Sequence, residues 1–126
     1  MQITDRQKEE QLTPILRQAF RPLFLLGAGF SAIAMLLWGV ALSGKLSLPV
    51  YGNIMFWHSH EMIFGFVIAI VLGFLLTAVQ NWTGLRAPHG KILLILTVLW
   101  AAGRLMLLLG GELPWWLVAA VGVSLL

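Results

Sequence analysis

Three long stretches of this sequence carry almost no charge, and this feature restricts the possible folds more than any other. Residues 23–42 contain no Asp, Glu, Lys or Arg, while residues 54–79 and 92–109 contain one each, Glu61 and Arg104. An α-helix rises about 1.5 Å per residue, so about 20 residues cross the roughly 30 Å hydrocarbon core of a bilayer. The sequence therefore predicts an all-α fold, a polytopic transmembrane helical bundle with three full spans.

The composition agrees with a membrane protein and excludes several other classes. Of the 126 residues, 60% are hydrophobic and 10% charged, and the mean hydropathy is +0.91, far from the average of soluble domains. The net charge of +3 comes from Lys and Arg scattered around the apolar stretches, so we expect no nucleic-acid partner. The chain has no cysteine, which excludes thiolate metal sites and disulfides. It has no nucleotide-binding loop, zincin motif or Ser/His/Asp set, so no catalytic residue is predicted.

The two ends of the chain differ from the three long stretches. Residues 1–21 are polar and form a predicted cytoplasmic lead-in. Residues 115–126 are apolar but reach only about 18 Å as a helix, which is too short to cross a bilayer. We expect a truncated fourth span, and residues 22–126 as the N-terminal fragment of a larger membrane domain. Later helices of the same protein, or an oligomeric partner, would complete it.

The positions of Lys and Arg predict the orientation in the membrane. Four of them lie in residues 1–21 and two in residues 81–91, whereas residues 43–53 hold only Lys45. Because cytoplasmic segments are enriched in these residues, we expect the N-terminus in the cytoplasm and the start of the second span on the periplasmic side. Tryptophans close to the predicted interfaces are expected to anchor the spans among the headgroups. These are Trp57, Trp82, Trp115 and Trp116.

A polar cluster, "HSHE" at residues 58–61, opens the second span. On a regular helix of about 100° per residue, His58 and Met62 lie within about 100° of Glu61, on one face with small residues spaced four apart. These small residues are Gly65, Ala69 and Gly73. Such a face lets membrane helices approach closely, so it is expected to pack against protein. His60 falls at about 260° and is expected to point away, toward another helix, the outer loop or lipid headgroups.

Glu61 and Arg104 are expected at the same depth in the bilayer. Glu61 lies about 10 Å below the start of the second span, and Arg104 about 9 Å below the end of the third. Each charge alone costs about 2.5 kcal/mol or more in the membrane, so an ion pair is one explanation. The alternative is that the forked donors of Arg104 hold an anion such as a haem propionate. Either the ion pair or a bound anion would compensate the buried charge of Arg104, and the sequence does not decide between them.

Histidine and methionine in this cluster are candidate metal ligands, because imidazole binds haem iron, copper and zinc, and a thioether binds copper or haem. His58 and Met62, one turn apart, could bind one centre. A centre shared by His58 and His60 requires a broken helix or a ligand from elsewhere. A histidine near an interface is also a common packing residue, so the pattern alone does not decide. His89 is expected to be a solvated turn residue without a ligand role.

Three segments of the sequence resemble the N-terminal portion of the NnrS family. They are "AFRPLFLLGAG" (residues 19–29), "WHSHEMIFGF" (residues 57–66) and "GFLLTAVQNWTG" (residues 73–84). The resemblance implies a helical protein of the bacterial inner membrane that contains haem and copper and is associated with denitrification, nitric oxide and nitrosative stress. Family members have more helices than this chain, which puts cofactor loading of this fragment in doubt.

The resemblance also implies which residues form the site. The matching positions are Arg21, His58, His60, Glu61, Met62, Gln80, Asn81 and Trp82. Together with the charge argument above, we expect cofactor binding by His58, His60, Met62 and Arg104. His58 and His60 are the expected metal ligands, and Glu61 with Arg104 is the expected supporting ion pair.

Two other functions fit the same residues. Four helices in a short chain is the size of small oligomeric proton-coupled transporters, in which Glu61 would carry the proton or cation. In a purely structural membrane subunit, the polar groups would only pair with one another.

Overall fold

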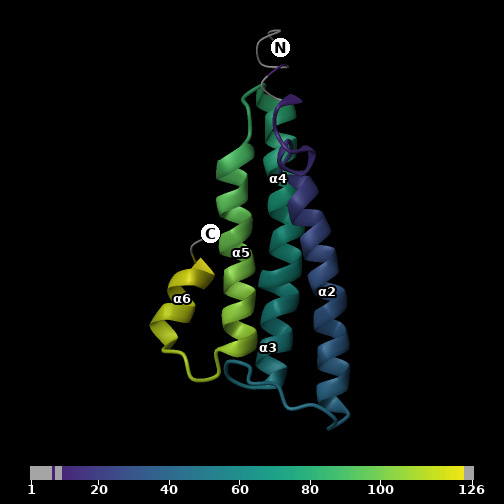
Figure 1. Cartoon of the computed structure of the whole chain (residues 1–126), viewed down its shortest axis with the longest axis vertical. Helices are drawn as coiled ribbons and strands as arrows, with labels where there is room; N and C mark the ends of the chain where they lie inside the picture. Colours follow the sequence, from purple (N-terminus) through teal and green to yellow (C-terminus); the bar gives the residue numbers. More distant parts are fainter. Residues whose placement is uncertain (1–6, 8–9, 124–126) are drawn as a thin grey trace.

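The computed structural model describes residue 7 and residues 10–123, and its regular elements are helical (Figure 1). The elements are η1 (Pro14–Leu16), α2 (Phe20–Leu42), α3 (Ile54–His60), η2 (Glu61–Val67), α4 (Ile68–Thr83), α5 (Gly90–Leu109) and α6 (Trp115–Val123). Three helices, Phe20–Leu42, Ile54–Thr83 and Gly90–Leu109, are long and apolar enough to cross a membrane. The predicted all-α transmembrane bundle with three full spans and a short fourth helix is confirmed. Residues 1–6, 8–9 and 124–126 of the predicted lead-in and fourth span lie outside the described residues.

Local sequence signals explain where several helices begin and end. Asn53 caps α3, because its side-chain oxygen accepts a hydrogen bond of 2.9 Å from the backbone N–H of Phe56. Pro22 lies in the first turn of α2, where its missing N–H has no helical partner to lose. Gly84 ends α4 with a φ of +68°, and its N–H donates to the carbonyl of Gln80.

The second span is one continuous helix with a change of winding inside it. Between α3 and α4 the segment η2 is π-helical over seven residues. At its end the N–H of Ile68 bonds to the carbonyl of Ile63, five residues back. Such π-segments are rare and occur often at functional sites. The regular spacing of 100° per residue therefore does not hold across residues 61–67.

The small-residue face of the second span packs against protein, as predicted, and the helix that it meets is α2. Gly65, Ala69 and Gly73 are all buried. A Cβ added at Gly73 would lie 3.2 Å from Cα of Phe20, and one added at Gly27 of α2 would lie 3.1 Å from Cβ of Ala69. The two backbones thus approach so closely that a larger side chain would separate them.

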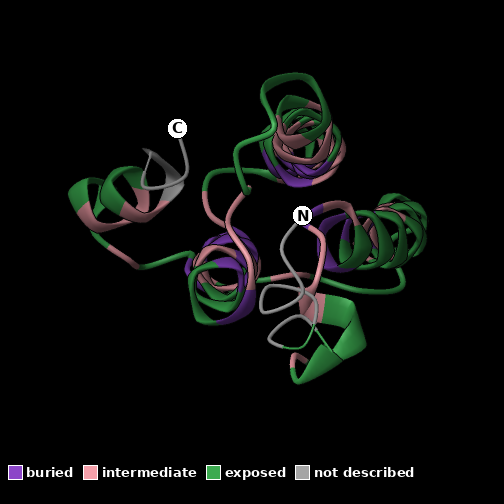
Figure 2. Ribbon diagram, turned by 90° about the horizontal axis from the view of Figure 1, so that it is seen from above, coloured by how far each residue is buried: buried purple, intermediate pink, exposed green. Residues whose placement is uncertain are grey.

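Seen from one end, the buried residues of the three long helices face one another around a shared axis (Figure 2). Their outer faces carry large apolar side chains, for example Leu25, Leu36 and Ile92, which are 63%, 71% and 61% exposed. A soluble protein rarely exposes so much apolar surface. The bundle is thus polar inside at one site and apolar outside, as a membrane protein requires.

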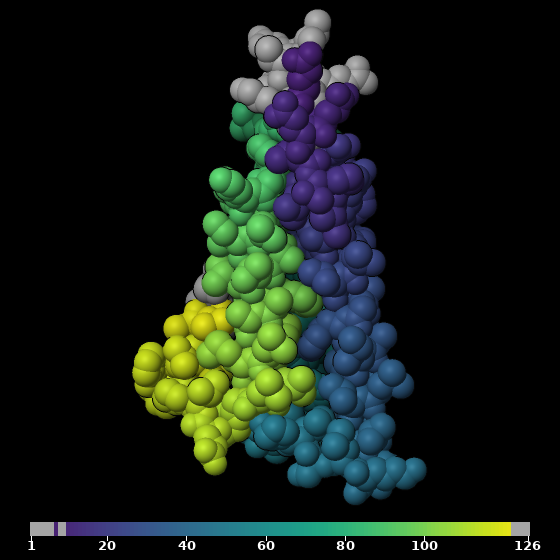
Figure 3. Space-filling view, viewed as in Figure 1, coloured from purple at the N-terminus to yellow at the C-terminus, as the bar shows by residue number. Residues whose placement is uncertain are grey.

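The loops 43–53 and 110–114 close the end of the bundle where α2 ends, and α6 starts from there (Figure 1). The N–H of Tyr51 donates to the carbonyl of Leu107, and the N–H of Gly111 donates to the carbonyl of Pro49. The helix α6 packs beside α5, on the far side from α2 (Figures 2 and 3). Trp57 lies in the packed core here with 0% exposure. Its predicted role as a headgroup anchor is wrong, because the loop and α5 cover it.

Candidate functional site

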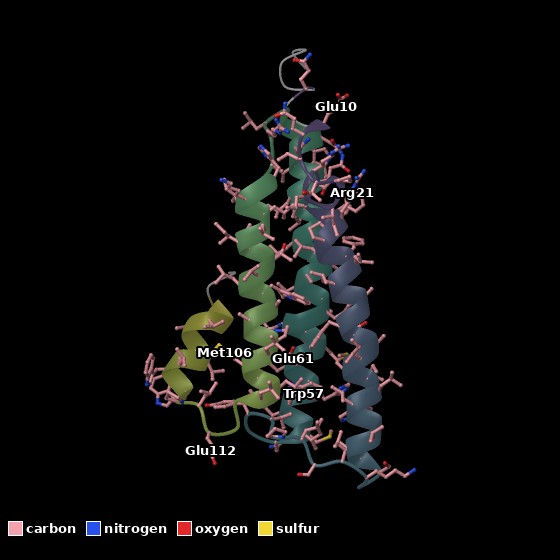
Figure 4. All side chains as sticks on the ribbon, in the orientation of Figure 1. Glu10, Arg21, Trp57, Glu61, Met106 and Glu112 are labelled. Atoms are coloured by element: carbon pink, nitrogen blue, oxygen red, sulfur yellow. The ribbon has the colours of Figure 1, made fainter. Side chains whose placement is uncertain are left out.

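Glu61 is the centre of a buried polar cluster near the Trp57 end of the bundle (Figure 4). Its side chain is 0% exposed. One carboxylate oxygen, Oε2, lies 3.2 Å from Nε of Arg104, and the other, Oε1, lies 3.2 Å from Nδ1 of His60. The structure thus brings together the two charges that the sequence places at equal depth.

Gly65 makes the space that this ion pair occupies. A Cβ at this position would lie 2.9 Å from Oε2 of Glu61, 3.3 Å from Cδ of Arg104 and 2.8 Å from Cε1 of Phe30. The two contacts below 3.0 Å are shorter than real Cβ contacts, so a larger residue would force the Glu61 carboxylate and the Phe30 ring to shift. A glycine in the middle of η2 is therefore a packing requirement of the site.

Trp100 links the π-segment to α5. Its Nε1 donates a buried hydrogen bond of 2.9 Å to the carbonyl oxygen of Gly65. Its ring also meets Phe30 of α2 edge to face, with centroids 5.7 Å apart. Three helices thus meet around one indole, and the carbonyl that the widened turn presents is satisfied inside the bundle.

His58 and His60 have different neighbours although only one residue separates them. The ring of His58 stacks on Trp38 of α2, with centroids 4.0 Å apart and planes at 10°. The ring of His60 stacks on Phe64 at 4.7 Å, and its Nδ1 faces Glu61. The prediction that His60 points away from Glu61 is wrong, because the imidazole swings back far enough to reach the neighbouring carboxylate.

Several buried polar atoms at this end have no hydrogen-bond partner within residue 7 and residues 10–123. They are Nε1 of Trp38 and of Trp57, Nδ1 of His58, Oε2 of Glu61, and Nε and Nη1 of Arg104. Oε2 and Nε are close enough for an ion pair but are not aligned as a hydrogen bond. A buried polar group without a partner is costly, so these atoms call for a partner from outside the described residues.

The described residues of this cluster do not form a complete metal site by themselves. Among the residues that the structure describes, no three His, Cys, Asp or Glu side chains come together as a metal site. Met62 is half-buried and packs against the apolar core around Trp57. His58 offers a buried ring nitrogen without a partner. It therefore fits as one ligand of a centre whose other ligands lie elsewhere.

The remaining residues matched by family resemblance lie at the opposite end of the bundle, where Figure 4 labels Arg21. Arg21 donates to the carbonyl of Pro14 over 2.8 Å, and Gln80 accepts a hydrogen bond from the N–H of Ala87. Asn81 and Trp82 are exposed. His89 is a half-buried turn residue, with Nδ1 2.8 Å from the carbonyl oxygen of Ala87. None of these residues contributes to the cluster around Glu61.

Sequence reasoning missed Trp38 as a neighbour of His58 and Trp57 as a core residue. Both lie in apolar stretches, where nothing in the local pattern separates a tryptophan that faces lipid from one that faces protein. The π-segment also has no sequence signal. Gly65 was identified as a small residue on the packing face, but its contact with the carboxylate depends on how α2 and α5 meet η2.

Comparison with known proteins gives one match. A family model described as "NnrS protein" matches residues 14–126. Neither the curated proteins nor the solved structures contain a match to this chain.

Proposed function

The chain belongs to the NnrS family, and on this premise we propose that it is a membrane protein of the nitric oxide response that binds haem or copper beside His58. The observation that carries this proposal is Nδ1 of His58, which is buried and has no partner within the described residues. His58 lies one helical turn before Glu61. Glu61 in turn pairs with Arg104 of α5 inside the apolar bundle. Polar groups at such a depth are expensive and usually mark function.

The cluster supplies one metal ligand and the residues that position it, but not a complete set of ligands. In the proposal, His58 would bind haem iron or copper, and the stacked ring of Trp38 would keep its imidazole in one orientation. His60 and Met62 are the further candidates from this chain. The other ligands come from additional helices of the protein or from an oligomeric partner. When bound, haem iron or copper supplies the affinity for nitric oxide.

Arg104 supports the site through Glu61. Its Nε already faces the carboxylate at 3.2 Å, so the charge is compensated within the chain. This contact favours the supporting role over the binding of a haem propionate, which would add a second negative charge to the cluster. The pair also ties α5 to η2 and thereby fixes the turn that carries His58.

Charge distribution supports a location in the bacterial inner membrane with the N-terminus in the cytoplasm. The segments 10–21 and 84–91, which contain Arg17, Arg21, Arg86 and Lys91, lie at the end of the bundle where α2 begins, and the loop 43–53 with Lys45 lies at the other end (Figure 1). By the positive-inside rule, the His58 end then faces the periplasm. The apolar outer faces of the helices make the lipid bilayer the main partner.

The two alternative functions have less support. A proton-coupled transporter would need Glu61 to exchange its partner with solvent, but Glu61 is 0% exposed and faces both Arg104 and His60. A purely structural subunit would pair its polar groups with one another. Nε1 of Trp38, Nε1 of Trp57 and Nδ1 of His58 are buried and lack such partners among the described residues.

Metal and haem content of the purified intact protein tests the proposal. We expect bound haem or copper in the wild type, strong loss in His58→Ala, and full retention in His89→Ala, because His89 lies at the opposite end of the bundle. A folded wild-type protein without either cofactor, or equal loading of the two variants, would contradict the assignment.

A further inference from the structure

An open groove of about 580 Å³ lies between η1 and the first turns of α2. The segment η1 lies against the start of α2, at the end of the bundle where that helix begins (Figure 1). Pro14 and Ile15 form one wall of the groove, and Phe24, Leu25 and Ala28 lie on the other wall. Ile15, Phe24 and Leu25 are exposed, so the groove opens away from the interior of the bundle, toward the surrounding lipid.

Arg21 carries the charge of this groove, because the other described residues that line it are apolar. Its Nη1 donates a hydrogen bond of 2.8 Å to the carbonyl oxygen of Pro14, which is itself a wall residue. This bond holds the guanidinium at the η1 wall of the groove. A guanidinium has five N–H donors, and Arg21 uses one of them within residue 7 and residues 10–123. Because the side chain is exposed, its other donors can meet a ligand.

The positive charge of Arg21 is not compensated by a carboxylate, and the same holds for Arg17, four residues earlier. Arg17 donates from Nε to the carbonyl oxygen of Leu12 over 3.2 Å and from Nη2 to that of Glu10 over 2.9 Å. Carbonyl oxygens carry no net charge. Among the described residues no carboxylate forms an ion pair with either arginine, the side chain of Glu10 included. Two uncompensated guanidinium groups thus lie close in sequence, and such groups favour a phosphate.

The start of α2 lies where the headgroups of a bilayer are expected. The helix is long and apolar enough to cross a membrane, and its residues 23–42 carry no charge. Arg21 comes just before them, so its guanidinium lies at the boundary of the hydrocarbon core, at the level of the lipid phosphates. Ala28 lies seven residues further along the helix, about 10 Å deeper. The groove therefore has a positive charge at the level of the phosphates and an apolar wall at the level of the acyl chains.

We propose that this groove binds a phospholipid with a net negative charge, whose phosphate contacts Arg21 and whose acyl chain lies along Phe24 and Ala28. Arg17 adds a second positive charge at the same end of the bundle. A zwitterionic lipid carries its own cation beside the phosphate, so it gains less from two uncompensated arginines. The site lies at the opposite end of the bundle from His58 and does not rest on cofactor binding.

Arg21→Gln and Arg86→Gln form a matched pair of variants that test the headgroup. Each removes one positive charge at the same end of the bundle, but Arg86 lies in the loop before α5 and does not line the groove. Native mass spectrometry of the intact protein in detergent measures the dissociation constant of the first bound lipid, dioleoylphosphatidylglycerol or dioleoylphosphatidylcholine. We expect the wild type to prefer phosphatidylglycerol at least about fivefold, Arg21→Gln to lose most of this preference and Arg86→Gln to keep it. Equal affinity of the wild type for the two lipids, or an unchanged preference in Arg21→Gln, would overturn the proposal.

Ala28→Phe and Ala32→Phe test the acyl-chain wall without changing a charge. Both alanines are exposed on α2, and Ala28 lines the groove whereas Ala32 does not. We expect Ala28→Phe to weaken binding of phosphatidylglycerol at least about fivefold, because the ring fills the groove, and Ala32→Phe to leave it unchanged. Unchanged binding in Ala28→Phe would contradict this location of the lipid. The chain has no cysteine, so efficient cross-linking of two Leu25→Cys chains in the membrane would show that a second copy covers the groove, which also overturns the proposal.

Discussion

Glu61 and Arg104 meet inside the bundle with 3.2 Å between Oε2 and Nε, and both side chains are almost completely buried. They come from different spans and are 0% and 5% exposed as residues. Because each charge compensates the other in an apolar surrounding, the pair joins the second and third spans without leaving a buried charge uncompensated. The same pair holds η2 in place beside His58.

Removal of one charge of this pair is expected to destabilise the protein more than removal of both. Glu61→Gln or Arg104→Met alone leaves a buried charge without a partner, which costs about 3–5 kcal/mol. The double variant avoids that cost, so its loss of stability should be smaller than either single loss and therefore well below their sum. Unfolding of the purified variants in detergent measures the three values. Additive losses would mean that the two charges do not interact.

The size limit at Gly65 can be tested with a single methyl group. Gly65→Ala places a Cβ 2.9 Å from the Glu61 carboxylate and 2.8 Å from Phe30, so we expect a loss of about 1–3 kcal/mol of stability. Gly39→Ala is the control, because the added Cβ meets open space and alanine favours the helix by about 1 kcal/mol. The thermal midpoints of both variants should therefore move in opposite directions. A stable Gly65→Ala protein would refute the close contact.

The hydrogen bond from Trp100 should protect the π-segment from opening. Trp100→Phe keeps most of the aromatic packing but removes Nε1, so the carbonyl of Gly65 loses its buried donor. We expect about 1–3 kcal/mol of destabilisation and faster amide exchange across residues 61–67. Trp116→Phe, at a tryptophan that is 59% exposed, should change neither quantity. Similar exchange in the two variants would contradict the role of this bond.

Stacking on Trp38 should keep the imidazole of His58 in one orientation. Trp38→Leu removes a parallel ring contact at 4.0 Å, worth about 0.5–1.5 kcal/mol beyond its buried area. The fold should persist, but less haem or copper should be retained, because the ligand ring becomes free to rotate. Trp116→Leu is the matched control on α6. Equal cofactor content in the two variants would show that Trp38 does not position His58.

The sequence was sufficient to predict the bundle because the relevant signal is long and local. Runs without charge define the spans, and the spacing of Gly65, Ala69 and Gly73 predicts the face that meets α2. Depth along two helices predicted the approach of Glu61 and Arg104, since the rise per residue of a helix is nearly constant.

The details of the site depend on contacts that no local pattern encodes. The helical wheel assumes one rotation per residue, and η2 breaks that assumption at Glu61. The wheel also gives only the direction in which a side chain leaves the helix, so it could not show that the His60 ring turns back to Glu61. A tryptophan near the start of a span, such as Trp57, can be either a headgroup anchor or a core residue. Trp57 is a core residue because the loop and α5 pack over it.

The most direct test of the proposed function is the optical response of the intact protein, as purified, to nitric oxide. We predict an absorption band of bound haem or copper that shifts saturably when nitric oxide is added, and a shift that is strongly reduced in His58→Ala. A folded wild-type protein whose spectrum does not respond to nitric oxide would contradict the account.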